Sequence, residues 1–150
     1  MENKWLSIQS FQRNQSLLDY INKVVIYLKL TGKNLDSKIS IAEVNQAKSI
    51  IAKFLTKLNG LVVSVENDAN DPMTGVDLKL RSFAKSFVDA RSRRTKFKSP
   101  LFASNIEYIQ NLLTSVGDEN KQALIDSLND LKLLLDEQIS LDTKEIISEI

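Results

Sequence analysis

Cysteine and histidine are both missing from this 150-residue chain. The lack of Cys excludes disulfides, thiolate metal sites and a Cys nucleophile, and it fits a reducing compartment. The lack of His removes the commonest general base and the commonest metal ligand, so proton transfer would depend on carboxylates, Lys or Tyr. A Ser-His-Asp triad or a zinc hydrolase cannot be built within this chain. We therefore expect a non-catalytic protein with no metal and no cofactor.

Glycine and proline are scarce, with four and two copies. Sandwiches and barrels need many turn residues, so this scarcity favours long helices. The longest uncharged apolar run, VVIYL at 24–28, is far shorter than the eighteen or so residues of a membrane span. The first residues, MENKWLSIQSFQRN, contain no apolar core of a secretion signal. We expect a cytoplasmic protein.

Apolar residues recur at helical spacing along most of the chain. The first stripe runs from about residue 13 to residue 30, with Gly32 placed to end it. A second helix is predicted to begin at Ser40, because SIAE at 40–43 has the pattern of a capping box in which Glu43 reaches back. Asn59-Gly60 interrupts this stripe, but the apolar phase continues to residue 65, which favours one continuous helix.

Three further helices are predicted over 76–90, 100–116 and 119–139, with a short amphipathic tail at 142–150. Loop residues fill 67–72, and Ser99-Pro100 marks a helix start. Leucines follow a 4-3-4 spacing from Leu124 to Leu135 in the fifth helix. The sequence therefore predicts an all-α fold: one domain over residues 1–150, a bundle of five to six helices.

The charges are divided unevenly along the chain, although the net charge is only +1. Residues 1–100 carry 17 basic and 9 acidic side chains, and residues 101–150 carry 3 basic and 10 acidic ones. This division indicates a basic surface and an acidic end.

The positive charge is concentrated in residues 79–98, which hold eight cations and a single acid, Asp89. We call these cations the basic strip: Lys79, Arg81, Lys85, Arg91, Arg93, Arg94, Lys96 and Lys98. On a helical wheel Arg81, Lys85 and Asp89 lie opposite the apolar face. From Arg91 onward the pattern breaks, because a continued helix would place Arg side chains inside the apolar stripe. Burial of an unpaired Arg costs roughly several kcal/mol. Residues 91–98 are therefore expected to be exposed.

The basic strip has three interpretations. It is a good electrostatic match for a phosphate backbone, since Arg adds bidentate phosphate geometry and Phe97 could stack on a base. It could instead dock on the acidic end, within the protein or in a neighbouring copy. It could also be a solvated face whose cations offset a helix dipole.

Other candidate sites are weaker. Asp68, Asp71 and Asp77 belong to the loop NDANDPMTGVD, in which the stretch DANDPMTG is similar to a calcium loop but lacks the acid spacing of an EF-hand and its bidentate Glu. There is no Gly-rich phosphate loop, which argues against nucleotide hydrolysis. Trp5 lies outside any clear stripe, in what is predicted to be a short N-terminal segment, and is a candidate anchor for a partner.

The cations of the segment LKLRSFAKSFVDARSRRTKFK belong to a small helical chain with an acidic end. In these features the chain resembles the small subunit of multi-subunit CRISPR effector complexes. The resemblance covers size and class and implies a filament-forming subunit whose basic side chains line a path for the guide heteroduplex or the displaced DNA strand. It implies a non-catalytic subunit of a ribonucleoprotein assembly in antiviral defence that contacts phosphates of RNA or DNA without sequence specificity. Partners would include other protein subunits, in particular head-to-tail copies of itself. The alternative is a helical adaptor or regulatory protein whose basic strip docks on an acidic protein partner.

Overall fold

The structure is a computed structural model that describes residues 2–29, 40–66, 78–90, 106–115 and 117–148. These residues form only helices, without any strand among them, which confirms the all-α prediction. The elements are α1 (Glu2–Lys29), α2 (Ile41–Glu66), α3 (Leu78–Ala90), α4 (Ile106–Thr114), the short 3₁₀ helix η2 (Asp118–Asn120) and α5 (Lys121–Ser148).

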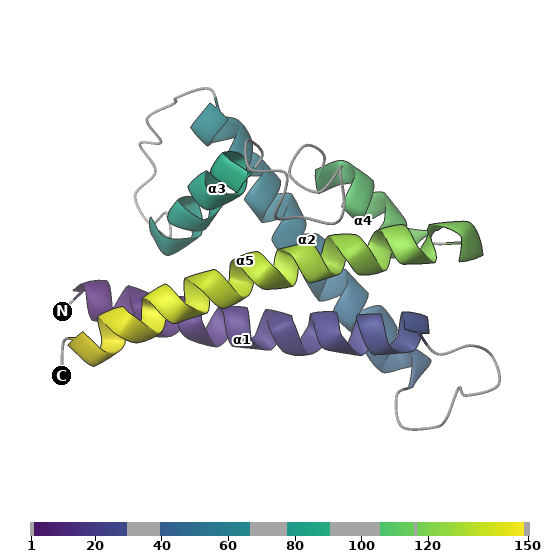
Figure 1. Cartoon of the computed structure of the whole chain (residues 1–150), viewed down its shortest axis with the longest axis horizontal. Coiled ribbons are helices and arrows are strands. Elements are labelled where there is room, and N and C mark those ends of the chain that lie inside the picture. The colour runs from purple at the N-terminus through teal and green to yellow at the C-terminus, as the bar shows by residue number, and fades with distance from the viewer. Residues whose placement is uncertain (1, 30–39, 67–77, 91–105, 116, 149–150) are drawn as a thin grey trace.

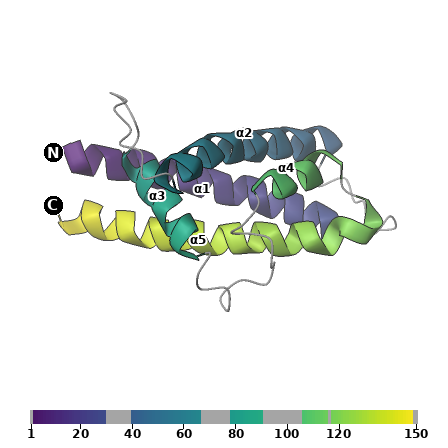
Figure 2. The same cartoon turned by 90° about the horizontal axis from the view of Figure 1, so that it is seen from above.

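The two longest helices, α1 and α5, have 28 residues each and run antiparallel side by side (Figure 1). The start of α1 and the end of α5 therefore lie at the same end of the molecule. Helix α2 crosses α1 on a diagonal (Figure 1). Seen from above, α3 crosses steeply between the α2 and α5 sides and α4 lies near the opposite end (Figure 2). Helix α2 packs on α1, and the shorter helices α3 and α4 pack mainly against α2.

The core is formed by one apolar face from each α-helix. Its largest fully buried side chains come from α1, α2, α3, α4 and α5 and include Ile21, Leu55, Phe83, Ile109 and Leu131. The aromatic contact between α2 and α3 is tilted, with the ring centroids of Phe54 and Phe83 6.0 Å apart. Burial of this kind stabilises a helix bundle by about 1.5–3 kcal/mol per large apolar side chain.

Two hydrogen bonds define the register of α1 against α5. Ser7 Oγ donates to Glu145 Oε2 at 2.6 Å, and Lys132 Nζ donates to Asn22 Oδ1 at 3.4 Å. In an antiparallel pair of helices, the residue numbers of two side chains that face each other add up to a nearly constant value. With this register, the buried residues between α1 and α5 can be ordered into successive levels, each with one side chain from α1 and one from α5. Four levels are apolar: Leu28 with Leu124, Val24 with Leu128, Ile21 with Leu131, and Leu17 with Leu135.

The seam becomes polar at the end where the chain begins and ends. Asn14 comes level with Gln138 and Ser10 with Asp142, and all four side chains are buried. The third polar level is Ser7 with Glu145. We call these three levels the polar end of the α1–α5 pair.

The polar end explains why two predicted helix limits are wrong. The first helix was expected from about residue 13 and begins at Glu2, and the last was expected to end near residue 139 and runs unbroken to Ser148. The apolar stripe stops at Leu17 and Leu135, but backbone hydrogen bonding continues because neither Gly nor Pro interrupts either extension. Trp5 therefore lies on α1, and the expected tail belongs to α5.

For the second helix, the cap at Ser40 and the continuation through Gly60 are confirmed, whereas the return contact expected from the Glu43 side chain stays a prediction. Ser40 Oγ accepts a hydrogen bond from the backbone N–H of Glu43 at 3.1 Å, as an N-cap should. The helix then passes through Gly60 without a break and ends at Glu66. The fourth helix ends at Thr114 instead of near residue 116, and its expected start at residue 100 lies outside the described residues. The short helix η2 was not predicted.

Candidate nucleic-acid interface

Helix α3 carries the first part of the basic strip and is strongly amphipathic. Leu80, Phe83, Ala84 and Phe87 are buried at 0–1% exposure, so they fix which side of the helix meets the core. Lys85 lies on the exposed side, as the helical wheel predicts. Its ammonium group is therefore presented to solvent by the packing of the opposite face.

Lys79 is engaged with α5. Its ammonium group makes a short hydrogen-bonded ion pair with the Glu145 carboxylate and lies 3.8 Å from Asp142 Oδ1. Its side chain is only 18% exposed. The first cation of the strip thus docks on the acidic end of its own chain, which is one of the outcomes considered from the sequence.

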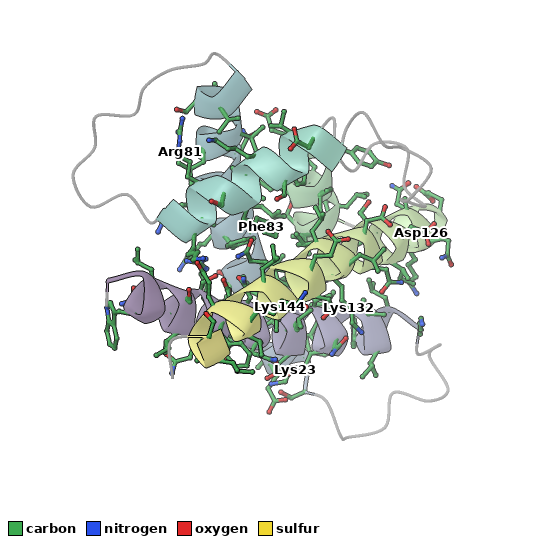
Figure 3. All side chains as sticks on the ribbon, turned by 60° about the vertical axis from the view of Figure 1, so that its left-hand side comes forward. Lys23, Arg81, Phe83, Asp126, Lys132 and Lys144 are labelled. Carbon is green, nitrogen blue, oxygen red and sulfur yellow. The ribbon has the colours of Figure 1, made fainter. Side chains whose placement is uncertain are left out.

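Arg81 lies on another side of α3. It is half-buried and its Nη1 donates to Ser64 Oγ of α2 at 3.3 Å. Figure 3 shows Arg81 on the side of the helix turned away from α5, while Phe83 points toward the core. The structure therefore does not bring Lys79 and Arg81 to one face, and Lys85 is the exposed cation of these three.

The other five cations of the strip, Arg91, Arg93, Arg94, Lys96 and Lys98, lie outside the described residues. The same holds for the loop acids Asp68, Asp71 and Asp77. Across the part of the chain that the structure describes, no cluster of three or more carboxylates is arranged to hold a metal ion. In that same part, every helix is too short or too polar to cross a membrane.

Two lysines outside the basic strip lie against aromatic rings of α1. Lys23 Nζ lies 5.8 Å from the centroid of the Tyr20 ring, and Lys48 Nζ lies 6.0 Å from that of Tyr27. Burial lowers the pKa of the Lys48 ammonium below its ordinary value. On α2, Lys53 and Lys57 are exposed. Exposed positive charge is therefore present on α2 as well as on α3.

A groove of about 500 Å³ opens between α3 and α5. Two cations, Lys79 and Lys144, line it together with hydroxyl groups of Ser82, Ser86 and Ser148, and Glu145 is the acid on its wall. The groove lies at the polar end of the α1–α5 pair.

Sequence reasoning missed the polar end itself. Gln138 Nε2 donates to Asp142 Oδ1 at 2.9 Å, and both side chains are buried. The signal was available, because the 4-3-4 spacing of the leucines continues from Leu135 to Gln138, Asp142 and Glu145. When only apolar residues are counted, the buried stripe of α5 ends at Leu135, before the buried polar residues Gln138 and Asp142.

Trp5 is 61% exposed on α1, so its indole makes little contact with the core. The prediction that it anchors a partner stays a prediction.

The chain matches no protein-family model, no curated protein and no solved structure.

Proposed function

We propose that the chain binds the phosphate backbone of nucleic acids, as a non-catalytic helical subunit of a larger ribonucleoprotein assembly. The observation that carries this proposal is the density of charge from α3 onward, eight cations against one acid over residues 79–98. Packing of the apolar face of α3 supports it, because this packing turns Lys85 into solvent.

The mechanism is electrostatic. Each phosphate neutralised by Lys or Arg releases condensed counterions, so affinity falls steeply with salt. Arg can hold a phosphate through two parallel hydrogen bonds. Such contacts position a backbone and carry no sequence information, so RNA and DNA are both expected ligands. The resemblance to CRISPR effector small subunits implies, more specifically, a path for a guide–target duplex or a displaced strand.

The test is a charge reversal at the densest point of the strip. Arg91, Arg93 and Arg94 are changed together to Glu, and binding to labelled single-stranded DNA and RNA is measured by fluorescence anisotropy. The matched control changes Lys29, Lys53 and Lys57 to Glu, which are exposed and give the same change in net charge.

The expected result is loss of binding in the Arg variant, retained binding in the Lys variant and unchanged helical circular dichroism in both. Unchanged affinity in the Arg variant would contradict the proposal. An equal loss in both variants would show that only the total charge matters and would contradict a local interface.

A second candidate function is favoured by the contact of Lys79 with Glu145 and Asp142, which shows a cation of the strip bound to protein carboxylates. In that case the chain is an adaptor that docks on an acidic protein surface. It predicts salt-sensitive binding to a protein partner and no retention on nucleic acid even at low salt.

A further inference from the structure

The groove between α3 and α5 has the chemistry of an anion site. Its two ammonium groups, on Lys79 and Lys144, and its three serine hydroxyls are groups that can donate hydrogen bonds, and the hydroxyls come from both helices. Within the protein, Ser86 Oγ donates to the Ser82 carbonyl oxygen at 3.2 Å, Ser148 Oγ donates to the Glu145 carbonyl oxygen at 2.9 Å, and Lys79 is bound to the Glu145 carboxylate. Ammonium and hydroxyl donors around a concave surface suit phosphate oxygens.

Glu145 supplies the anion that meets one of these donors, the Lys79 ammonium. Its carboxylate is bound to Lys79 of α3 and accepts a hydrogen bond from Ser7 of α1, so one side chain joins three helices. These two contacts, Lys79 first, lower the pKa of the Glu145 carboxyl below its ordinary value of 4.5. The carboxylate is thus held in its charged form beside the groove donors.

Glu145 and Asp142 differ in how easily their carboxylates can move away from Lys79. The Glu145 side chain is 41% exposed, whereas that of Asp142 is 0% exposed and is hydrogen-bonded by Gln138. Glu145 can rotate toward solvent without opening the core, and Asp142 would remain to orient Lys79. An anion that competes for the Lys79 ammonium would therefore displace the Glu145 carboxylate.

Resting on the proposed function, we infer that this groove is a phosphate-binding subsite on the nucleic-acid path, and that Glu145 occupies it until a backbone phosphate displaces its carboxylate from Lys79. Glu145 is in this sense an internal competitor for the ligand. Removing its charge releases Lys79, which adds one phosphate contact to the interface.

The experiment is a double-mutant cycle on Glu145→Gln and Lys79→Met, read by anisotropy with labelled single-stranded DNA across a range of salt concentrations. The control is Asp136→Asn, an exposed acid on the same helix whose replacement gives the same change in net charge. Thermal melts by circular dichroism verify that each variant is folded.

Glu145→Gln is expected to bind about tenfold more tightly than wild type near 50 mM salt and to steepen the log–log salt slope by about one, the effect of one added phosphate. Asp136→Asn is expected to stay near wild type. Lys79→Met should change little by itself, because Lys79 is already occupied, and should cancel the gain in the Glu145→Gln background.

The outcomes separate the two proposals. If wild type binds but Glu145→Gln and Asp136→Asn have equal affinities, the subsite is refuted and backbone binding stands. If the gain survives Lys79→Met, it does not come from Lys79, and the subsite is again refuted. If no variant binds at low salt, the proposed function itself fails.

Discussion

Gln138→Leu is predicted to destabilise the protein, although it places an apolar side chain at a buried position. Gln138 is 5% exposed and donates at 2.9 Å to Asp142, which is 0% exposed. Asp142 Oδ2 is buried with no hydrogen-bond partner among the described residues, so Gln138 supplies the hydrogen bond on which this carboxylate depends. Replacing Gln138 leaves the buried carboxylate in place and removes its donor.

The two opposing effects differ in size. Loss of a hydrogen bond to a charged group costs about 1.5–3 kcal/mol, which includes the desolvation of the carboxylate left without its donor. The Lys79 ammonium, 3.8 Å from Asp142 Oδ1, stays beside this carboxylate and keeps the cost within that range. The greater apolar burial of Leu over Gln returns about 1 kcal/mol. The net loss is about 0.5–2 kcal/mol, which lowers Tm by about 2–6 °C for a domain of this size.

The companion variant Gln138→Leu/Asp142→Leu removes the carboxylate as well. Replacing a buried polar pair by apolar side chains of similar volume is neutral or stabilising, by up to about 4 kcal/mol. The double variant is therefore expected to regain at least wild-type stability, while Glu145 still pairs with Lys79.

Urea unfolding followed by helical circular dichroism measures both changes, provided that the slope with urea stays constant. A single Gln138→Leu variant as stable as wild type would refute this account of the polar end. So would additive effects of the two substitutions, because the reasoning requires them to be coupled.

Three further predictions concern single positions. The pKa of Glu145 is lowered in the folded state, so the stability that Glu145 contributes is complete above pH 4.5, its ordinary pKa, and is lost as the pH falls through the folded-state pKa. Glu145→Gln should therefore flatten the acid limb of a curve of Tm against pH, and an unchanged limb would contradict this. Gly60→Ala should raise stability by about 0.5–1 kcal/mol in a urea titration, because an added Cβ there meets nothing within 4 Å inside a helix; a loss would indicate a contact not seen at this site. Ser40→Ala should cost about 1 kcal/mol through the lost cap on Glu43, whereas Ser40→Asp should not.

The bundle could be predicted from the sequence where side chains alternate between core and solvent at helical spacing. Ile51, Leu58, Phe83 and Leu128, for example, lie on predicted stripes and are fully buried. Helix limits were missed at the polar end, because Ser10 and Asp142 are polar residues that the partner helix buries. The 4-3-4 spacing of α5 does continue to Asp142, but the burial of these polar positions is a property of the packed pair and is not visible in either stripe alone.

The candidate interface shows the same division. The number of cations near α3 is a property of the sequence, whereas their availability depends on partners distant in the chain. Lys79 meets Glu145 across 66 positions, and Arg81 meets Ser64 across 17. The helical wheel places Lys85 on the exposed side, but no local pattern predicts that Lys79 is paired with a carboxylate of α5.

The salt dependence of nucleic-acid binding tests backbone recognition most directly. Wild-type protein is titrated into labelled single-stranded DNA and RNA of unrelated sequences, at salt concentrations from about 50 to 200 mM. The account predicts that log affinity falls linearly with log salt for every strand, with a slope of several units and little dependence on sequence. Affinity that is absent at the lowest salt, or that does not change with salt, would contradict it.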